Sequence, residues 1–169
     1  MSVLTTDRLT LRPLTFDDAD FVVALLNEPA WLRFIGDRGV KNVADARRYL
    51  EKGPLAMYLR FGFGHYLVQR TEDGAALGIC GLVKRETLAD FDLGFAFREP
   101  YRGQGYAYES SQAALAHGKD VMGLKRVVAI TAPDNENSIR LLEKLGFAYE
   151  RMTWMGENGA ASKLFARGL

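Results

Sequence analysis

The chain has 169 residues, a length typical of one domain, and we expect a single domain over residues 1–169. The 22 Lys and Arg residues nearly balance the 21 Asp and Glu residues, so no overall charge draws the chain to nucleic acid or to a membrane. The single cysteine, Cys80, excludes an intramolecular disulfide framework and a cysteine-rich zinc site, and we expect no metal. No apolar run reaches the roughly 18 residues of a membrane span, and the pattern predicts a cytoplasmic protein.

The first half of the chain predicts a strand, two helices and then a hairpin. Leu9-Thr10-Leu11-Arg12 alternates apolar and polar residues, as a half-buried strand does. Thr15 is placed to cap a helix with an apolar face, and Pro29 limits that helix. The aromatic segment 31–36 is expected to be a connection to the second helix. The expected ranges are 9–12 for the strand, about 15–27 and 43–50 for the helices, and 65–70 and 75–83 for the hairpin.

The second half begins with the clearest two-residue period of the chain, Phe91–Phe97, which has large side chains on one face and small ones, apart from Asp92, on the other. Gly146 stands where a left-handed residue ends the last helix. The expected ranges are 105–119 and 135–145 for helices, and 127–131, 147–154 and 163–166 for strands. Hairpins make the three central strands antiparallel, and the later strand–helix–strand passage requires a crossover to a parallel neighbour. We therefore expect an α/β (α+β) fold with a mixed, mainly antiparallel central sheet and the order β-α-α-β-β-β-α-β-α-β-β.

The turn Tyr101-Arg102-Gly103-Gln104-Gly105-Tyr106-Ala107 lies between the aromatic strand and a helix. Its two glycines let the backbone turn tightly and approach a ligand without interference from a Cβ atom. The start of the helix offers unpaired N–H groups and a partial positive charge, which together bind anions. A plain strand-to-helix turn is the alternative. The third glycine of a dinucleotide-binding fingerprint and the glycines of a Walker A loop are missing, so neither of those phosphate sites fits.

Four segments resemble motifs of the GNAT N-acetyltransferase superfamily. Arg102, Gly105 and Ala107 match its acyl-CoA pyrophosphate signature, Gln/Arg-x-x-Gly-x-Gly/Ala. The segment 135–147, with Asn-x-x-Ser at its start and Gly-Phe at its end, is similar to a second family motif. Residues 6–14 and 92–95 are similar to the branch that contains the ribosomal-protein N-terminal acetyltransferases. The likeness covers nearly the whole chain and implies a GNAT-like fold and transfer of an acetyl group from acetyl-CoA to a primary amine.

The resemblance also implies where acetyl-CoA binds. Its pyrophosphate is expected on the N–H groups of the turn, and its thioester where two strands splay apart and leave an N–H free near Phe97 for the oxyanion. Asn135 matches a family position that contacts the pantetheine arm or its waters, and its alternative role is that of a helix N-cap. The expected cofactor-binding residues are Phe95, Ala96, Phe97, Arg102, Gly103, Gln104, Gly105, Tyr106, Ala107, Asn135 and Ser138.

Candidate acids and bases are few. Where some family members carry a catalytic Glu and a catalytic Tyr, this chain has Ile130 and Leu142. Asp92 and Ser138 are the candidate catalytic residues, and their alternatives are a hydrogen-bonded strand carboxylate and a plain helix serine. A peptide α-amine, with a pKa near 7.7–8.0, is neutral roughly one time in ten at pH 7 and needs little help from a base. A lysine-like amine is neutral only about once in a few thousand and needs far more.

The acceptor site is expected beneath the connection between the first two helices, which covers the open end of the sheet in related folds. Trp31 and Phe34 are the expected substrate-binding residues, and the alternative for Trp31 is that it only anchors a loop. His65 is either a base or a structural residue. Family habit makes a homodimer possible. The competing function is an acyl-CoA-binding module of the same fold without acetyl transfer, which the missing Glu and Tyr would suit.

Overall fold

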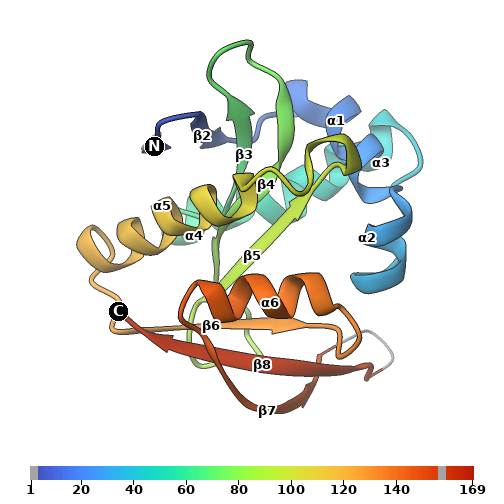
Figure 1. The fold of residues 1–169 in the computed structure, drawn as a ribbon. Helices are drawn as coiled ribbons and strands as arrows, with labels where there is room; N and C mark the ends of the chain where they lie inside the picture. Colours follow the sequence, from blue (N-terminus) through green and yellow to red (C-terminus); the bar gives the residue numbers. More distant parts are fainter. Residues whose placement is uncertain (1–3, 156–158) are drawn as a thin grey trace.

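The computed structural model describes residues 4–155 and 159–169, which form one sheet of eight strands with helices on both faces (Figure 1). The strand order is β1-β2-β3-β4-β5-β6-β8-β7, and only the β5–β6 pair is parallel among the described strands. The expected mixed, mainly antiparallel sheet is thereby confirmed, as is the crossover to a parallel neighbour. The strands are β1 Leu4–Thr5, β2 Leu9–Pro13, β3 His65–Arg70, β4 Ala76–Val83, β5 Asp92–Phe97, β6 Arg126–Thr131, β7 Ala148–Trp154 and β8 Ala161–Gly168.

The helices lie where the sequence predicts them, with additions in the first half of the chain. Thr15 caps a short 3-10 turn, and Asp18 completes a capping box before α1 begins. The segment expected to be a connection is instead helix α2, because Pro29 ends one helix and occupies the first position of the next, where its missing N–H costs nothing. The helices are α1 Ala19–Leu26, α2 Pro29–Phe34, α3 Val43–Leu50, α4 Ala56–Phe61, α5 Tyr106–Asp120 and α6 Glu136–Lys144, with short helical turns at Phe16–Asp18, Glu51–Leu55 and Glu99–Tyr101.

The two faces of the sheet carry different helices. Helices α5 and α6 lie on one face (Figure 1), where Leu93 and Phe97 of β5 belong to the same buried cluster as Leu115 of α5. Helices α1 and α3 lie on the other face, where Leu25 and Leu50 pack in a cluster that also holds Leu67 and Ile79 of the sheet. The large apolar side chains of β5 thus pack on the α5 side, whereas Ala96 is the β5 residue that packs against the second cluster. No helix in the two described ranges is long and apolar enough to cross a membrane.

Strands β5 and β6 separate soon after they begin. Their recorded pairing is the single register pair Asp92–Val128, next to a hydrogen bond from the Val128 N–H to the Phe91 carbonyl at 3.0 Å. Beyond this point the two strands no longer pair within the described part of the chain, and α5 starts close to the free end of β5. The separation leaves main-chain groups of a central strand without a partner strand.

Candidate active site

A cavity of about 830 Å³ opens between the separated ends of β5 and β6 and reaches both faces of the sheet. Its volume lies in the range of small-molecule and cofactor sites. We call the part lined by residues 101–108 and 135–144 the α5 end. The part lined by α2, α3 and the sheet residues that face them is the α2 end.

The turn at the α5 end brings glycine into the left-handed region twice, at Gly103 with φ +73° and at Gly105 with φ +83°. Gly105 is the N-cap of α5, and no side chain caps this helix. Within residues 4–155 and 159–169, no main-chain amide from Gly103 to Tyr108 donates a hydrogen bond to a protein acceptor. A run of unpaired N–H groups at a helix start is an arrangement that binds anions.

Glu28, the residue before α2, forms hydrogen bonds with residues at the start of this turn. Its carboxylate accepts hydrogen bonds from Arg98 Nε at 3.2 Å, the Glu99 main-chain N–H at 3.0 Å and Arg102 Nη2 at 2.9 Å. Arg102 Nε also donates to the Phe97 carbonyl at 2.9 Å. Arg102 therefore lines the cavity as expected of a cofactor-binding residue, but much of its guanidinium is engaged by the protein itself. No local pattern around Glu28 indicates this role, because its partners lie about 70 positions away.

Gln104 forms hydrogen bonds that stabilise the turn, and it does not line the cavity. Its side-chain Nε2 donates to the Pro100 carbonyl at 3.1 Å, and its own carbonyl accepts from Arg8 Nη1 at 3.0 Å. Arg8 in turn donates to Glu109 of α5, through Nε at 2.7 Å and through its main-chain N–H at 2.9 Å. Among the expected residues of the turn, Arg102, Gly103, Gly105, Tyr106 and Ala107 line the cavity, and Gln104 does not.

The edge of β5 faces the cavity with main-chain groups. The Arg98 N–H donates to Leu77 on the β4 side, so alternation along an antiparallel strand turns the N–H groups of Phe95 and Phe97 toward β6. These two residues lie beyond the point where β6 stops pairing. Phe95, Ala96 and Phe97 all line the cavity, and their edge can donate hydrogen bonds to a ligand between the strands.

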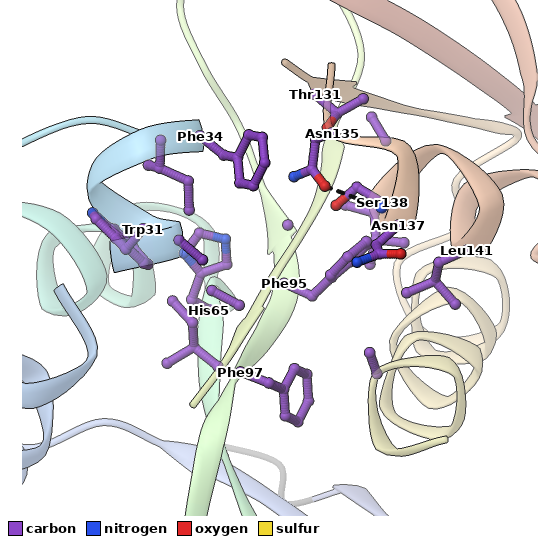
Figure 2. A pocket seen from close by; sticks show the side chains of 18 of the residues that line it. Trp31, Phe34, His65, Phe95, Phe97, Thr131, Asn135, Asn137, Ser138 and Leu141 are labelled. Atoms are coloured by element: carbon purple, nitrogen blue, oxygen red, sulfur yellow. Dashed lines mark hydrogen bonds between the residues drawn. The ribbon is translucent and has the colours of Figure 1, made fainter. Parts of the chain in front are cut away.

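The start of α6 contributes Asn135 and Ser138 to the same end of the cavity (Figure 2). Asn135 is the N-cap of α6, and its Oδ1 accepts a hydrogen bond from the Ser138 main-chain N–H at 3.3 Å. The capping role that the sequence left as an alternative is therefore present, on a side chain that also lines the cavity. Lys144, the last residue of α6, lies over the ring of Tyr108 at 4.4 Å and adds a positive charge.

The α2 end is walled by aromatic and apolar side chains. Trp31 and Phe34 of α2 both line it (Figure 2), together with Tyr49 of α3 and Met57 of α4. Trp31 is 6 % exposed, and its Nε1 has no hydrogen-bond partner among the described residues. The predicted substrate-binding pair therefore lies on the cavity wall, opposite the α5 end.

His65, at the start of β3, packs against β5 from the α2 side. Its Nε2 is buried without a partner in the described part of the chain, and a Cβ atom on Gly94 would lie 2.4 Å from it. Burial and, to a smaller extent, the positive charge of Arg85 together lower the pKa of His65 to about 4. His65 is therefore neutral at pH 7, and Gly94 must remain without a side chain to leave room for it.

Asp92, expected to be catalytic, lies behind the cavity wall. Its side chain is 2 % exposed, and its Oδ2 accepts a hydrogen bond from Arg85 Nε at 2.6 Å. Burial raises the pKa of Asp92, and the guanidinium of Arg85 opposes that effect. Arg85 lines the cavity, whereas Asp92 does not. The structure thus places the strand carboxylate in a hydrogen-bonded pair and presents the arginine to a ligand.

The cavity contains no side-chain carboxylate among the described residues. Ile130 and Leu142 line it at the positions where some family members carry a catalytic Glu and Tyr, so they offer neither a base nor an acid. The charged residues that do line it are Arg38, Arg85, Arg102 and Lys144, and all four are basic. The arrangement suits negatively charged ligands and main-chain stabilisation of an anion.

A family model described as an acetyltransferase (GNAT) domain matches residues 8–148. YkkB, an uncharacterized protein of Bacillus subtilis (strain 168), is 29% identical over 157 residues, with 88% of this chain and 86% of YkkB covered. YnaD, an uncharacterized N-acetyltransferase of the same organism, is 29% identical over 147 residues, with 87% of this chain and 83% of YnaD covered.

Solved structures show the same fold. A putative GnaT-family acetyltransferase from Bordetella pertussis is 29% identical, with a TM-score of 0.81 and 99% of both chains covered. RimL, a ribosomal L7/L12 α-N-protein acetyltransferase solved with coenzyme A, superposes with a TM-score of 0.84 at 20% identity, with 99% of this chain and 98% of RimL covered. The expected likeness in fold to ribosomal-protein acetyltransferases is confirmed, and acetyl transfer is favoured over acyl-CoA binding alone. The chain belongs to the GNAT acetyltransferase family, whose members transfer an acetyl group from acetyl-CoA to an amine.

Proposed function

We propose that the α5 end binds the diphosphate and the pantetheine arm of acetyl-CoA. The observation that carries this proposal is the run of unpaired amides from Gly103 to Tyr108 at the uncapped start of α5. Hydrogen bonds to a charged group contribute about 1.5–3 kcal/mol each, so two or three of these amides supply much of the binding free energy. Arg102 and Lys144 add positive charge at the same end. Asn135 lies where it can contact the pantetheine arm.

The main-chain edge of β5 is the proposed oxyanion site. Bound acetyl-CoA supplies the thioester; the new C–N bond forms as the C–S bond breaks, and a proton passes from the amine to the departing sulfur. The N–H groups of Phe95 and Phe97 face the gap and can donate to the carbonyl oxygen as negative charge develops on it. We assign Ser138, whose side chain lines the cavity, the donation of a hydrogen bond to the sulfur. Asp92 acts as a positioning residue, through Arg85.

The preferred acceptor in this proposal is an α-amine, on a protein N-terminus or on a small molecule. The cavity offers no carboxylate base among the described residues, and His65, with a pKa of about 4, is too weak a base to deprotonate an ammonium group at pH 7. An α-amine near pKa 7.7–8.0 supplies its own neutral fraction of roughly one in ten, whereas a lysine-like amine does not.

The test is release of free thiol from acetyl-CoA by the purified protein with matched amines. Peptides with a free N-terminus and a blocked lysine are compared with peptides that have a blocked N-terminus and a free lysine. We expect kcat/KM at pH 7 to favour the α-amine by about tenfold or more, and the gap to narrow as pH rises toward the lysine pKa near 10.4. Equal rates at pH 7 would contradict the α-amine preference. Saturable binding of acetyl-CoA without transfer to any amine would contradict the proposed reaction.

A further inference from the structure

The positive charges of the cavity fall into two separate pairs. Arg102 and Lys144 lie at the α5 end, where the phosphates of the proposed acyl donor bind. Arg38 and Arg85 lie at the α2 end, against the opposite face of the sheet, where the donor presents no negative group. The second pair therefore has no role in holding acetyl-CoA, and it lines the space that the second substrate must occupy.

The hydrogen bond to Asp92 orients the Arg85 guanidinium and uses only its Nε atom. Its Nε donates to the Asp92 carboxylate at 2.6 Å, from a side chain that is 38% exposed. Its Nη1 and Nη2 make no hydrogen bond within the described residues. Arg85 lines the cavity, so its terminal Nη1 and Nη2 groups are left to bind a ligand there. A pair of guanidinium NH₂ groups matches the two oxygens of a carboxylate.

Arg38 and Tyr49 extend this cluster. Arg38, in the segment between α2 and α3, is exposed and makes no ion pair in residues 4–155 and 159–169. Burial raises the pKa of the Tyr49 hydroxyl, and the positive charges of Arg38 and Arg85 both act against that rise. Arg38, Tyr49 and Arg85 all line the same cavity. Trp31 and Met57 provide an apolar wall beside them.

We infer that the acceptor is a primary amine that carries a carboxylate close to the amino group, with Arg38 and Arg85 binding that carboxylate. This inference rests on the proposed function and specifies its second substrate. An apolar side chain of the acceptor packs on Trp31 and Met57. Polyamines and polycationic antibiotics are excluded, because they would bring several positive charges against two arginines where no acidic side chain lines the cavity among the described residues. The carboxylate of the acceptor favours the ammonium form of its own amine, and the two arginines offset that effect by neutralising the carboxylate.

A panel of matched amines tests this inference by thiol release. Phenylalanine and phenylalaninamide share the ring and differ in the carboxylate. Their kcat/KM values are compared per neutral amine, because the carboxylate raises the pKa of the phenylalanine amine. Two dipeptide amides, with phenylalanine first and either glutamate or glutamine second, make the same comparison for a peptide N-terminus. Spermidine represents the polyamines. We expect kcat/KM to be at least tenfold higher for the acidic member than for the neutral member in one of the two pairs. A difference in the phenylalanine pair indicates a free amino acid as the acceptor, and a difference in the dipeptide pair indicates a peptide N-terminus. A neutral member or spermidine that equals or exceeds the acidic members would overturn the inference.

Two variants and one control test whether Arg38 and Arg85 cause the preference for an acidic acceptor. Arg38→Ala is expected to raise KM for the acidic acceptor about fivefold and to leave KM for its neutral partner and for acetyl-CoA within twofold. Arg85→Lys keeps a positive charge beside Asp92 but removes the fork, so it should act in the same direction without unpairing the buried carboxylate. Arg47→Ala is the control, because Arg47 is an exposed arginine of α3 that lies over Phe16, outside the cavity lining. An unchanged acid-to-neutral ratio in both Arg38→Ala and Arg85→Lys would refute the assignment.

A binding measurement separates this inference from the proposed reaction. N-acetylphenylalanine and its amide are titrated by calorimetry into the protein saturated with coenzyme A. Binding of the acid but not the amide, and its loss in Arg38→Ala, supports the carboxylate site even in the absence of any transfer. Transfer to amines with equal binding of acid and amide overturns the carboxylate site and leaves the acetyltransferase function intact. Absence of both binding and transfer overturns both.

Discussion

The two ends of the cavity are built from different parts of the polypeptide. The α5 end relies on main-chain amides of one short stretch, Gly103 to Tyr108, and on the main-chain edge of β5. The α2 end relies on side chains from four separate segments, namely Trp31, Arg38, Tyr49 and Arg85. A site made from main-chain amides depends on the backbone conformation, so it tolerates side-chain changes that preserve that conformation and leave the amides accessible. A pocket made of side chains changes its specificity with each substitution. Under the proposed function, the fold would combine a main-chain site for the acyl donor with an adjustable site for the acceptor.

The largest expected effect is that of Gly105→Asp on acetyl-CoA binding. The substitution places a carboxylate among the amides and a Cβ at a φ of +83°, so it removes roughly two charge-assisted hydrogen bonds, about 3–4 kcal/mol, or at least about 100-fold in Kd. Calorimetry measures the change. Gly123→Asp is the matched control, because Gly123 has a φ of +69° in open space outside the cavity and carries the same backbone strain. Equal losses of affinity in the two variants would show that strain, not the anion site, is responsible.

Acid should destabilise the α2 end through His65. The folded pKa of about 4 lies below the ordinary value of 6.5, so between these pH values the unfolded chain binds the extra proton and the native state does not. Stability from this group is complete above pH 6.5 and falls as pH decreases toward 4, by about 3 kcal/mol in total. Urea unfolding at pH 7 and at pH 4 measures this loss, and His65→Gln should remove it. His117→Gln is the comparison, because the pKa of His117 is lowered by less complete burial and its effect should be smaller. An identical pH dependence in wild type and His65→Gln would contradict the assignment.

Phe34→Ala is expected to affect the acceptor alone. The variant removes an aromatic wall of the α2 end, so KM for the amine should rise about tenfold, which is about 1.4 kcal/mol, while KM for acetyl-CoA stays unchanged. Steady-state kinetics with both substrates varied make the comparison. Phe16→Ala is a close control, because Arg47 lies over its ring at 4.7 Å as Arg33 lies over Phe34 at 4.6 Å, and Phe16 does not line the cavity. A rise in KM for acetyl-CoA would show that the two ends are not separable.

The smallest expected effect is that of Arg102→Ala on acetyl-CoA affinity. The guanidinium of Arg102 already binds Glu28 and the Phe97 carbonyl, and Glu28 keeps its bonds to Arg98 and to the Glu99 N–H in the variant. We expect Kd to rise about threefold, well below one kcal/mol, because the amides do most of the binding. A loss as large as that in Gly105→Asp would show that the α5 end depends on side chains after all.

Main-chain features of this protein are predictable from its sequence because they depend on local chemistry. Glycine at positions 103 and 105 allows the left-handed backbone that the turn requires, and the alternation of β5 follows from its own side chains. The helix α2 escaped prediction, because Pro29 both ends a helix and begins one, and its sequence carries no other start signal. Each of these sequence patterns is contained within a few neighbouring residues.

The α2 end of the cavity could not be predicted to the same extent, because its residues come together only in the folded chain. Trp31 and Phe34 were expected from the family likeness, but nothing near Arg38 or Arg85 in sequence indicates that both reach the same cavity as Tyr49. Asp92 was singled out for its position on β5, whereas the residue that it presents to the cavity, Arg85, lies in the loop before it. Glu28 likewise acquires its three partners only when α2 packs beside the turn.

The single register pair between β5 and β6 makes a seam in the sheet, with β1–β5 on one side and β6–β8 on the other. A ligand that fills this seam contacts both halves in the native state and neither in the unfolded chain. At one hundred times its Kd such a ligand adds about 2.7 kcal/mol to the free energy of unfolding. We therefore expect occupancy of the cavity to hold the two half-sheets together and to increase resistance to heat and proteolysis as the ligand concentration rises.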